Sequence, residues 1–460
     1  MNARTGQRIL VIGAARQGLA LARYLATHGA QVILNDRQPA EKLETEMRSL
    51  SDLSIQWETG GHPVHLLDQV DLVCISGGVP LDLPIVIEAL RRGLPLSNDS
   101  QIFMEEVPCP VVGITGSAGK TTTTTLVGRM AQTAVKSPAR AWIGGNIGLP
   151  LIDLLDQIQA ADVVVLELSS FQLELMTRSP QVAAILNITP NHLDRHGTME
   201  AYTAAKAHIL AYQSGDDSAV LGRDDPGSWG LASEVKGRLV SFGLDRPPSG
   251  QCGAYTQDAK IRLKEGARSY DLLPVSQINL RGQHNLLNVL AACAIAFAAG
   301  FEREAFAAGV EGFNGVPHRL EMVRRWHDAA WYNDSIATAP ERTMAAIRSF
   351  NEPLVLLLGG RDKNLPWSEL AELVHQRVDH LIVFGEAAPK ILQALGPQVR
   401  GRRPYSLAVA SGLQEAVQAA ATVADPGMVV LLSPGGTSYD EFNDFEERGE
   451  RYRQWVKQLS

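Results

Sequence analysis

A run of eight residues near position 120 has the composition of a phosphate-binding loop. It reads T-G-S-A-G-K-T-T over 115–122, follows the short apolar run 111–114 and precedes a segment with helical character. Glycines let the backbone curl so that several N–H groups point at one anion, and the N-terminal end of a helix adds partial positive charge. We expect Lys120 to reach the outer phosphates and the Thr121 hydroxyl to ligate Mg²⁺. The segment therefore predicts that the protein handles a nucleoside triphosphate.

The loop departs from the strict pattern of such sites. The form G-x-x-x-x-G-K-[ST] requires glycine at position 114, where the chain has Ile114. Relaxed matches arise by chance, so a Gly-Lys turn without a ligand is the alternative. The position of the loop directly after an apolar strand favours phosphate binding.

A carboxylate follows a second apolar run. Glu167 comes directly after residues 161–166, in the segment L-E-L-S-S-F-Q-L. Ligands of open α/β sheets bind beyond the carboxyl ends of the strands, so Glu167 is placed for a second contact to Mg²⁺. A capping role for the helix that follows is the alternative.

Two further polar side chains have less defined roles. His192 lies in a polar cluster, 187–196, after the apolar run 182–186. That position favours a ligand or phosphate contact without fixing its role, whereas a lone histidine is usually structural. Lys206 lies on an alanine-rich helix, and taken alone it is a solvated surface lysine.

The N-terminal segment predicts a β-α-β unit. A strand over 8–12 is followed by the loop 13–18, a helix to about residue 28 and a strand over 31–35. Ala15 replaces the middle glycine of a dinucleotide loop, and its methyl group hinders close approach to a pyrophosphate. A ligand loop and a plain strand–helix turn both stay open. If a nucleotide binds, Asp36 is placed for a ribose hydroxyl or a uracil N–H, and Arg37 for a phosphate.

Two more α/β units follow the first. We expect buried strands at 71–75, 111–114, 161–166, 182–186, 353–358, 380–384 and 428–432, helices at 198–213 and 284–300, and an antiparallel edge within 239–275. Linkers are expected at 106–110 and 312–317. The expected fold is α/β in three domains: a Rossmann-like domain over 1–108, a P-loop ATPase-like domain with a parallel or mixed sheet over 109–315, and a Rossmann-like domain over 316–460.

Composition excludes several classes. The chain has 460 residues, a net charge of −8 and no basic block, which argues against a nucleic-acid binder. No apolar run reaches about 18 residues, so no membrane span is expected. The first residues lack the apolar core of a signal peptide, and the four cysteines are scattered without a C-x-x-C pair. We expect a cytosolic protein with reduced thiols and no structural zinc.

Motifs along the whole chain resemble those of the Mur ligases of peptidoglycan synthesis. They are, in order, T-G-S-x-G-K-T-T, G-G-N-I-G (144–148), L-E-L-S-S-F-Q-L-E (166–174), N-H-L-D-R-H (191–196), Y-x-x-A-K (202–206), G-x-H-N-x-x-N (282–288), P-H-R (317–319), N-D-S-x-A-T (333–338) and S-P-G-G-T-S-Y-D-E-F (433–442). The third and last are most similar to the branch that adds D-glutamate to UDP-N-acetylmuramoyl-L-alanine. The resemblance implies a monomeric, cytoplasmic, ATP-dependent amide ligase whose partners are these small molecules and ATP.

The resemblance also implies roles for individual residues. The catalytic set would be Lys120, Glu167, His192 and Lys206. Two Mg²⁺ ions are implied, one held by Thr121 and Glu167, the other by His192 and a carbamylated lysine at position 206. Residues implied around ATP are Gly116, Ser117, Ala118, Gly119, Lys120, Thr121, Thr122, Asn285, Asn288, Arg319 and Asp334. Those implied on the uridine side are Arg16, Gln17, Asp36, Arg37, Ser76 and Gly78, with Asn146 and Gln172 near the sugar–alanine end. The incoming glutamate would meet Thr338, Lys363, Ser438, Tyr439 and Phe445.

The implied reaction is acyl activation. The L-alanyl carboxylate attacks the γ-phosphate to give an acyl phosphate, the glutamate amine attacks the carbonyl carbon, and the tetrahedral intermediate loses phosphate. Mg²⁺ and Lys120 would supply positive charge where negative charge gathers.

Departures from the family pattern keep alternatives open. Ile336 stands where the family has lysine, Ala339 where it has asparagine, Asn191 where many members have an acid, and Arg16 lies within an altered glycine loop. A relative that adds L-glutamate therefore stays possible. Folylpolyglutamate synthase shares the phosphate loop but is not expected to have the first domain. A non-catalytic nucleotide-binding regulator is disfavoured, because all four residues of the implied catalytic set are present.

Overall fold

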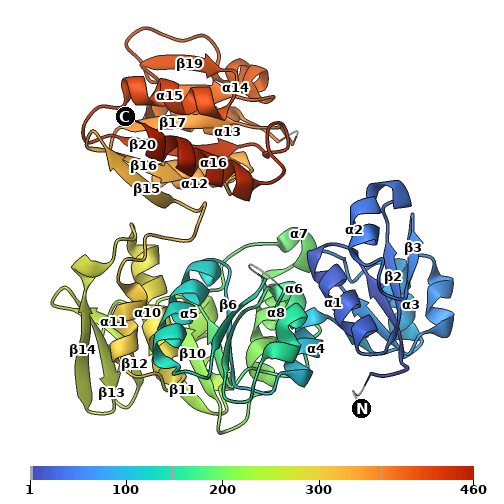
Figure 1. Ribbon diagram of the computed structural model, residues 1–460. Coiled ribbons are helices and arrows are strands. Elements are labelled where there is room, and N and C mark those ends of the chain that lie inside the picture. Colours follow the sequence, from blue (N-terminus) through green and yellow to red (C-terminus); the bar gives the residue numbers. More distant parts are fainter. Residues whose placement is uncertain (1–3, 147–149, 364, 460) are drawn as a thin grey trace. The chain divides into compact units, whose positions relative to one another are not determined.

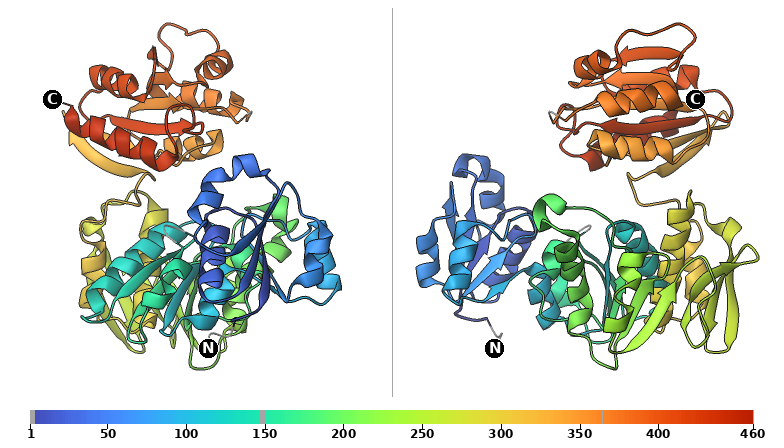
Figure 2. Two further views of the ribbon diagram at one scale, coloured as in Figure 1. Left: turned by 45° about the vertical axis from the view of Figure 1, so that its right-hand side comes forward. Right: turned by 180° about the vertical axis from the view of Figure 1, so that it is seen from behind.

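The computed structural model describes residues 4–146, 150–363 and 365–459. It has the expected mixed α/β fold, with three separate sheets (Figures 1 and 2). Contacts divide the chain into two compact units, one formed by residues 1–278 with 283–311 and the other by 279–282 with 312–460. The first unit contains two of the sheets and the second contains the third.

The N-terminal sheet is parallel, in the order β3-β2-β1-β4-β5. Alternate residues of β1 point to its two faces: Ile9 and Val11 pack with α1 and α4, whereas Leu10 and Ile12 pack with α3. This doubly wound arrangement confirms the β-α-β expectation. The elements are β1 (Arg8–Ile12), α1 (Arg16–Thr27), β2 (Gln31–Asp36), α2 (Glu44–Ser49), β3 (Ile55–Thr59), β4 (Leu72–Ile75), α3 (Pro84–Arg91), β5 (Leu96–Ser97) and α4 (Asp99–Glu106).

The central sheet has the order β14-β13-β12-β11-β10-β9-β6-β8-β7. The strands from β12 to β7 are parallel, and β13 and β14 add the antiparallel edge expected within 239–275. Its elements are β6 (Val111–Thr115), α5 (Lys120–Ala134), β7 (Ala141–Gly145), β8 (Val163–Glu167), α6 (Ser170–Leu173), β9 (Val182–Ile185), α7 (Leu193–His196), α8 (Met199–Ala211), β10 (Ser218–Gly222), α9 (Pro226–Trp229), β11 (Arg238–Phe242), β12 (Cys252–Gln257), β13 (Lys260–Glu265), β14 (Arg268–Pro274), α10 (Gln283–Ala298) and α11 (Glu304–Val310).

Helices cover the central sheet. Ala183 and Ile185 of β9 join the apolar cluster that contains Ile209 and Leu210 of α8. Helices α5, α10 and α11 pack against one another, and α5 and α10 also pack on the sheet. These buried strands are continuous apolar runs because both of their faces are covered.

The sheet of the second unit has the order β15-β16-β20-β17-β18-β19, with β15 antiparallel to its neighbour and the other strands parallel. Leu356 of β17 packs with α12 and α13, and Leu357 packs with α15 and α16. The elements are β15 (Glu321–Trp326), β16 (Ala329–Asn333), α12 (Pro340–Arg348), β17 (Leu354–Gly359), α13 (Ser368–Arg377), β18 (Val378–Phe384), α14 (Ala388–Leu395), β19 (Ser406–Ala410), α15 (Leu413–Val423), β20 (Val429–Gly435) and α16 (Phe445–Gln458).

Two sequence expectations about the chain as a whole can be compared with the structure. All four cysteines are free, and Cys74, Cys109 and Cys293 are buried. Among the helices of the described ranges, none is long and apolar enough to cross a membrane.

A buried polar joint connects the two sheets of the first unit. Asn98 donates to the backbone carbonyl of Gln172 at 2.7 Å, and the Gln172 side-chain amide donates to the Ser100 hydroxyl at 2.7 Å. Asp99 lies in the same segment, and its Oδ1 is buried without a hydrogen-bond partner. Burial raises the pKa of Asp99 to about 6. The joint therefore contains a carboxyl group that resists ionisation.

We predict that Asp99 makes the protein less stable as pH rises. Its folded-state pKa lies above the unfolded value, so its contribution is fully present below about pH 4 and is lost as pH rises through about 6. A rise from about 4 to about 6 corresponds to about 3 kcal/mol. The melting temperature of Asp99→Asn relative to the unsubstituted protein should therefore increase between pH 4 and pH 7. A difference that does not change with pH would contradict this assignment.

Gly18 should tolerate no side chain. A Cβ at this position would lie 1.8 Å from the carbonyl oxygen of Gly13 and 2.7 Å from the Ser76 hydroxyl. We predict that Gly18→Ala lowers stability by about 1–3 kcal/mol or more, because backbone must move. Gly78→Ala is the matched control, since a Cβ there meets nothing within 4 Å. Thermal unfolding of both variants tests the prediction, and equal melting temperatures would contradict it.

Candidate functional site

The phosphate loop connects β6 to α5 as the sequence predicts. Gly119 precedes α5 in a left-handed conformation, with φ of 80°, and a Cβ there would lie 2.2 Å from Oδ1 of Asn288. The Asn288 amide also donates to Oδ1 of Asn285 at 3.0 Å. Glycine is thus required at 119 both for backbone geometry and for the approach of α10. The predicted residues Asn285 and Asn288 therefore lie at the loop.

Side chains from neighbouring strand ends hold the loop. Asn187 accepts from the backbone N–H of Ala118 at 2.8 Å and donates to its carbonyl at 3.1 Å. The Ser117 hydroxyl donates to the carbonyl of Thr189 at 2.9 Å and lies 3.0 Å from the Tyr202 hydroxyl. Sequence reasoning did not assign Asn187 or Tyr202. Their positions in the sequence could have indicated them, because Asn187 follows β9 and Tyr202 begins the motif that contains Lys206.

Two lysine side chains converge on one carbonyl oxygen of the loop. Lys120 Nζ lies 2.8 Å from the oxygen of Gly116, and Lys206 Nζ lies 3.1 Å from the same atom. Lys206 is 1% exposed and its Nζ lies 4.7 Å from the centroid of the Tyr202 ring. Taken alone, the sequence favours a solvated Lys206, and that interpretation is wrong. The packing of α8 on β6 and β9 buries this face of the helix.

The environment of Lys206 disfavours its charged form. Burial, and then the positive charge of Lys120, lower the pKa of Lys206 to about 7, while Glu167 opposes the change. A substantial fraction of Lys206 is therefore a free amine at neutral pH. A free amine is a nucleophile, unlike the ammonium of a surface lysine.

Glu167 ends β8 beside the loop. Its register partner on β6 is Ile114, and it is 2% exposed. Oε1 accepts from the Asn146 amide at 3.2 Å, whereas Oε2 is buried without a hydrogen-bond partner. The cap of the following helix α6 is Ser169, not Glu167. An unpartnered carboxylate oxygen in this place fits a cation.

His192 lies on the turn before α7. It has a left-handed backbone, with φ of 53°, its side chain is exposed, and its ring meets the Phe171 ring edge-on at 5.2 Å. Within the described residues, no group of three or more His, Cys, Asp or Glu side chains could hold a metal ion. A metal here would therefore need ligands such as the Thr121 hydroxyl, phosphate oxygens or a modified lysine.

The predicted uridine-side residues lie around the loop after β1. The Asp36 carboxylate accepts from the backbone N–H groups of Ala14 and Gln38, each at 2.8 Å. Ser76 donates to the carbonyl of Gly13 at 3.0 Å. These two side chains hold the loop in shape. Arg16 and Arg37 are exposed and Gln17 is half-buried.

Gln172 has its polar atoms engaged inside the protein. Its Oε1 accepts from the backbone N–H of Ser169 at 3.0 Å, and its Nε2 donates to Ser100. It is 1% exposed. Its predicted contact with the sugar–alanine end stays a prediction.

In the second unit, predicted residues gather at the carboxyl ends of β16, β20 and β17. Asp334 accepts from the Ser433 hydroxyl at 2.8 Å and from the backbone N–H of Leu320 at 3.2 Å. Burial raises the pKa of Asp334 to about 7. Ser438 is buried, whereas Tyr439 is exposed. The other predicted residues here are Arg319, Thr338 and Phe445, which are half-buried, and Lys363, which is exposed.

Ile336 and Ala339 lie just before the first residue of α12. Ala339 is the N-cap of α12 and makes no side-chain cap hydrogen bond. Ile336 is half-buried, and its carbonyl accepts from Arg342 at 3.3 Å.

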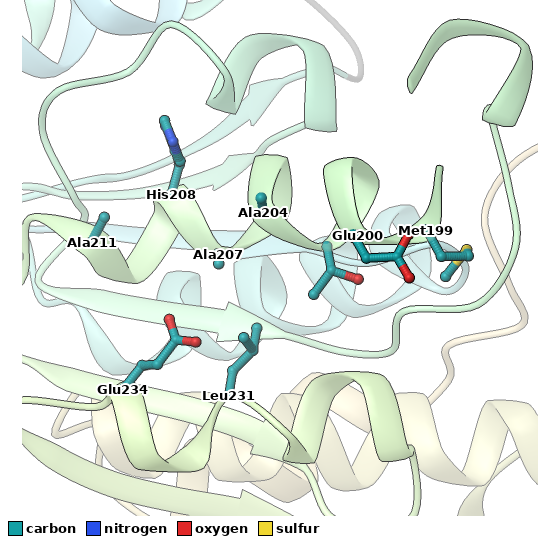
Figure 3. Close-up of a pocket in the computed structure, with 9 residues that line it drawn as sticks. Met199, Glu200, Ala204, Ala207, His208, Ala211, Leu231 and Glu234 are labelled. Atoms are coloured by element: carbon teal, nitrogen blue, oxygen red, sulfur yellow. The ribbon is translucent and has the colours of Figure 1, made fainter. Parts of the chain in front are cut away.

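A groove of about 580 Å³ runs along α8 (Figure 3). Glu200 and Ala207 of α8 line one side of it and Leu231 and Glu234 line the other, whereas the His208 ring points away from Leu231 and Glu234. Lys206 is not among its lining residues. The same helix thus contributes to the groove and, through Lys206, to the phosphate loop.

Family comparisons match three segments of the chain. The "Mur ligase MurD-like, N-terminal domain" matches residues 7–97, the "Mur ligase middle domain" matches 114–296, and the "Mur ligase, glutamate ligase domain" matches 318–436. The three matches follow the three sheets.

Individual relatives match nearly the whole chain. UDP-N-acetylmuramoylalanine–D-glutamate ligase of Symbiobacterium thermophilum is 41% identical over 99% of this chain and 98% of its own. The ligase of the same name from Pelotomaculum thermopropionicum is 39% identical, again over 99% of this chain and 98% of its own. Among solved structures, UDP-N-acetylmuramate-alanine ligase MurC from Thermotoga maritima has the same fold, with a TM-score of 0.55 and 19% identity over 98% of this chain and 99% of that one. The chain belongs to the Mur ligase family.

Proposed function

We propose that the protein is an ATP-dependent ligase that joins D-glutamate to UDP-N-acetylmuramoyl-L-alanine in peptidoglycan precursor synthesis. The observation that carries this proposal is the convergence of Lys120 and Lys206 on the Gly116 carbonyl, beside the buried carboxylate Glu167. Relatives with this activity in their names match the chain from end to end, which supports the choice of substrates.

ATP is the proposed partner of the phosphate loop. The N-terminal end of α5 favours negative charge, and Lys120 adds a full positive charge. Asn288 on α10 lies against Gly119 and donates to Asn285, and both would extend the nucleotide contacts. In the second unit, Arg319 and Asp334 are the further nucleotide residues that we propose.

The residues present fit Mg²⁺. Oε2 of Glu167 is buried without a hydrogen-bond partner, and Thr121 lies in the first turn of α5. We propose that these two groups hold one ion, and that His192 and Lys206 hold a second. When bound, Mg²⁺ neutralises phosphate charge and polarises the γ-phosphoryl group.

We propose that the second Mg²⁺ is held by Lys206 in a carbamylated form, whose oxygens are the ligands that Mg²⁺ prefers. The free amine attacks CO₂, the new N–C bond forms, and one proton is released, which leaves an anionic carbamate. The lowered pKa of Lys206 supplies the free amine, and the positive charge of Lys120 stabilises the anionic product. An unmodified ammonium cannot ligate a metal ion.

The proposed reaction proceeds by phosphoryl transfer and then amide formation. The L-alanyl carboxylate oxygen attacks the γ-phosphorus of ATP, and ADP leaves. The glutamate amine attacks the acyl carbon, loses a proton, and phosphate leaves with the C–O bonding electrons. Lys120 holds positive charge where the phosphate charge gathers. Thr338, Lys363, Ser438, Tyr439 and Phe445 are the proposed contacts of glutamate.

L-Glutamate is a second candidate for the amino acid that the enzyme adds. Ile336 and Ala339 differ from the family pattern within the segment that contains Thr338. An L-glutamate ligase is therefore the alternative, because few pocket contacts set stereochemistry. We further propose a cytoplasmic monomer with domains at 1–108, 109–315 and 316–460, each built on one of the three sheets.

Phosphate release tests the function. Purified protein with ATP, Mg²⁺ and UDP-N-acetylmuramoyl-L-alanine should release phosphate when D-glutamate is added and should not do so with L-glutamate. Release with L-glutamate alone would support the ligase mechanism but would show that the substrate is L-glutamate and not D-glutamate. No release with either amino acid would overturn the proposed function.

Loss of the phosphate-loop lysine should abolish turnover. We predict that Lys120→Ala lowers phosphate release by at least about 100-fold, because it removes charge stabilisation in the transition state. Circular dichroism and the melting temperature should stay close to those of the unsubstituted protein. Lys136→Ala is the matched control, since Lys136 is exposed after the same helix. Near-normal turnover in Lys120→Ala would refute the phosphate-loop assignment.

Replacement of Lys206 tests the carbamate. We predict that Lys206→Ala lowers activity by about 10- to 100-fold, as expected when a metal site is weakened. Formate or acetate should restore part of it by occupying the space of the carbamate, whereas chloride at equal ionic strength should not. Full activity of the variant, or equal effects of all three salts, would show that no carbamate acts there.

A further inference from the structure

Arg195 of α7 holds a loop of the N-terminal sheet. Its guanidinium donates to the backbone carbonyl of Val79 at 3.0 Å and to that of Gly78 at 3.4 Å. The loop 76–79 packs against the loop that follows β1. Ser76 donates to the Gly13 carbonyl, and a Cβ on Gly13 would lie 2.9 Å from the Val79 side chain. Arg195, which belongs to the region of the central sheet, is thus hydrogen-bonded to the loop 76–79, which we propose to face the uridine.

The same guanidinium begins a row of ring contacts. It lies 4.4 Å from the centroid of the Phe171 ring. The His196 ring stacks on Phe171, with centroids 5.2 Å apart and an interplanar angle of 4°. Bonds to Glu174 and Ser170, each at 3.0 Å, fix the orientation of His196. The His196 side chain is 2% exposed, so this packing is internal.

The row continues to the phosphate loop. The rings of His196 and Tyr202 lie 5.1 Å apart. The Tyr202 hydroxyl lies 3.0 Å from that of Ser117, and its ring lies 4.7 Å from Lys206 Nζ. Arg195, Phe171, His196, Tyr202 and Ser117 therefore form an uninterrupted series of contacts, which we call the Arg195 relay.

We propose that Arg195 is a positioning residue that couples the loop 76–79 to the phosphate loop, so that a UDP-sugar bound at one raises the affinity for a nucleoside triphosphate at the other. This inference rests on the proposed function, which supplies the two ligands. Chains of packed side chains and hydrogen bonds can carry energetic coupling between two sites, and the Arg195 relay connects the two loops by such contacts.

The position of His192 adds a reason for the coupling. His192 has φ of 53°, a conformation that non-glycine residues adopt only when their surroundings enforce it. It lies three residues before Arg195 in the same turn, and its ring also contacts Phe171. The contacts that anchor Arg195 therefore also anchor the turn that presents His192.

Titration calorimetry on the full chain measures the coupling. The affinity for UDP-N-acetylmuramoyl-L-alanine is determined with and without Mg²⁺ and a non-hydrolysable ATP analogue, and the affinity for the analogue with and without the sugar nucleotide. We expect each ligand to tighten the other by the same factor, at least about fivefold, because linkage is reciprocal. In Arg195→Met the factor should fall below about twofold, while each ligand alone binds nearly as before.

Matched variants separate the relay from general docking of the two sheets. Arg23 also connects these parts, through an ion pair with Asp153 at 3.2 Å, but takes no part in the relay. Arg23→Met should keep the coupling. Tyr202→Phe removes only the hydroxyl that meets Ser117 and should weaken the coupling. The double variant Arg195→Met with Tyr202→Phe should lose no more than Arg195→Met alone, since the two act in series.

Three outcomes of these binding measurements would contradict the proposal. Independent binding of the two ligands to the unsubstituted protein would overturn the relay and leave the ligase function intact. Equal loss of coupling in Arg23→Met and Arg195→Met would also overturn it, because any contact between the sheets would then suffice. Failure to bind the sugar nucleotide at all would overturn the proposed function and this inference together.

Discussion

The phosphate loop of this protein depends on one constraint, which is that two lysine side chains meet at a single carbonyl oxygen. The ammonium groups of Lys120 and Lys206 share the single carbonyl oxygen of Gly116, and Lys206 is almost entirely buried. Burial of Lys206, and then the positive charge of Lys120, disfavour its charged form and lower its pKa to about 7. Opposite it, Glu167 keeps a buried oxygen without a hydrogen-bond partner. Anionic phosphate, a cation and a modified amine would each relieve part of this imbalance.

The same edge of each sheet bears the polar residues because parallel strands end together. In the central sheet, Ile114 of β6 pairs with Glu167 of β8, and Thr115 pairs with Ile185 of β9. Loops that leave these neighbouring ends therefore meet, and Asn187 can brace a loop almost seventy positions earlier in the chain. In the second unit, the ends of β16 and β20 bring Asp334 to Ser433 in the same way. Ligand sites at carboxyl edges follow from this topology.

The sequence could predict elements whose signal is local. Apolar runs located the buried strands, the glycines and Lys120 located the phosphate loop, and alternating segments indicated the antiparallel edge. It could not predict partners far apart in the chain. The contact of Tyr202 with Ser117 and the bond from Arg195 to Val79 depend on how α7 and α8 pack, which no local pattern records. Burial of Lys206 was missed for the same reason, since an alanine-rich helix shows weak amphipathicity and both faces look alike.

Two arginine side chains act on the buried carboxyl group of Asp334. Arg342, in the first turn of α12, donates to the Ile336 carbonyl, and its charge together with that of Arg319 opposes the rise in the pKa of Asp334 that burial causes. Burial still dominates, so the pKa of Asp334 stays at about 7. A cation or a cationic ligand that approaches Asp334 would lower this pKa and favour the ionised carboxylate.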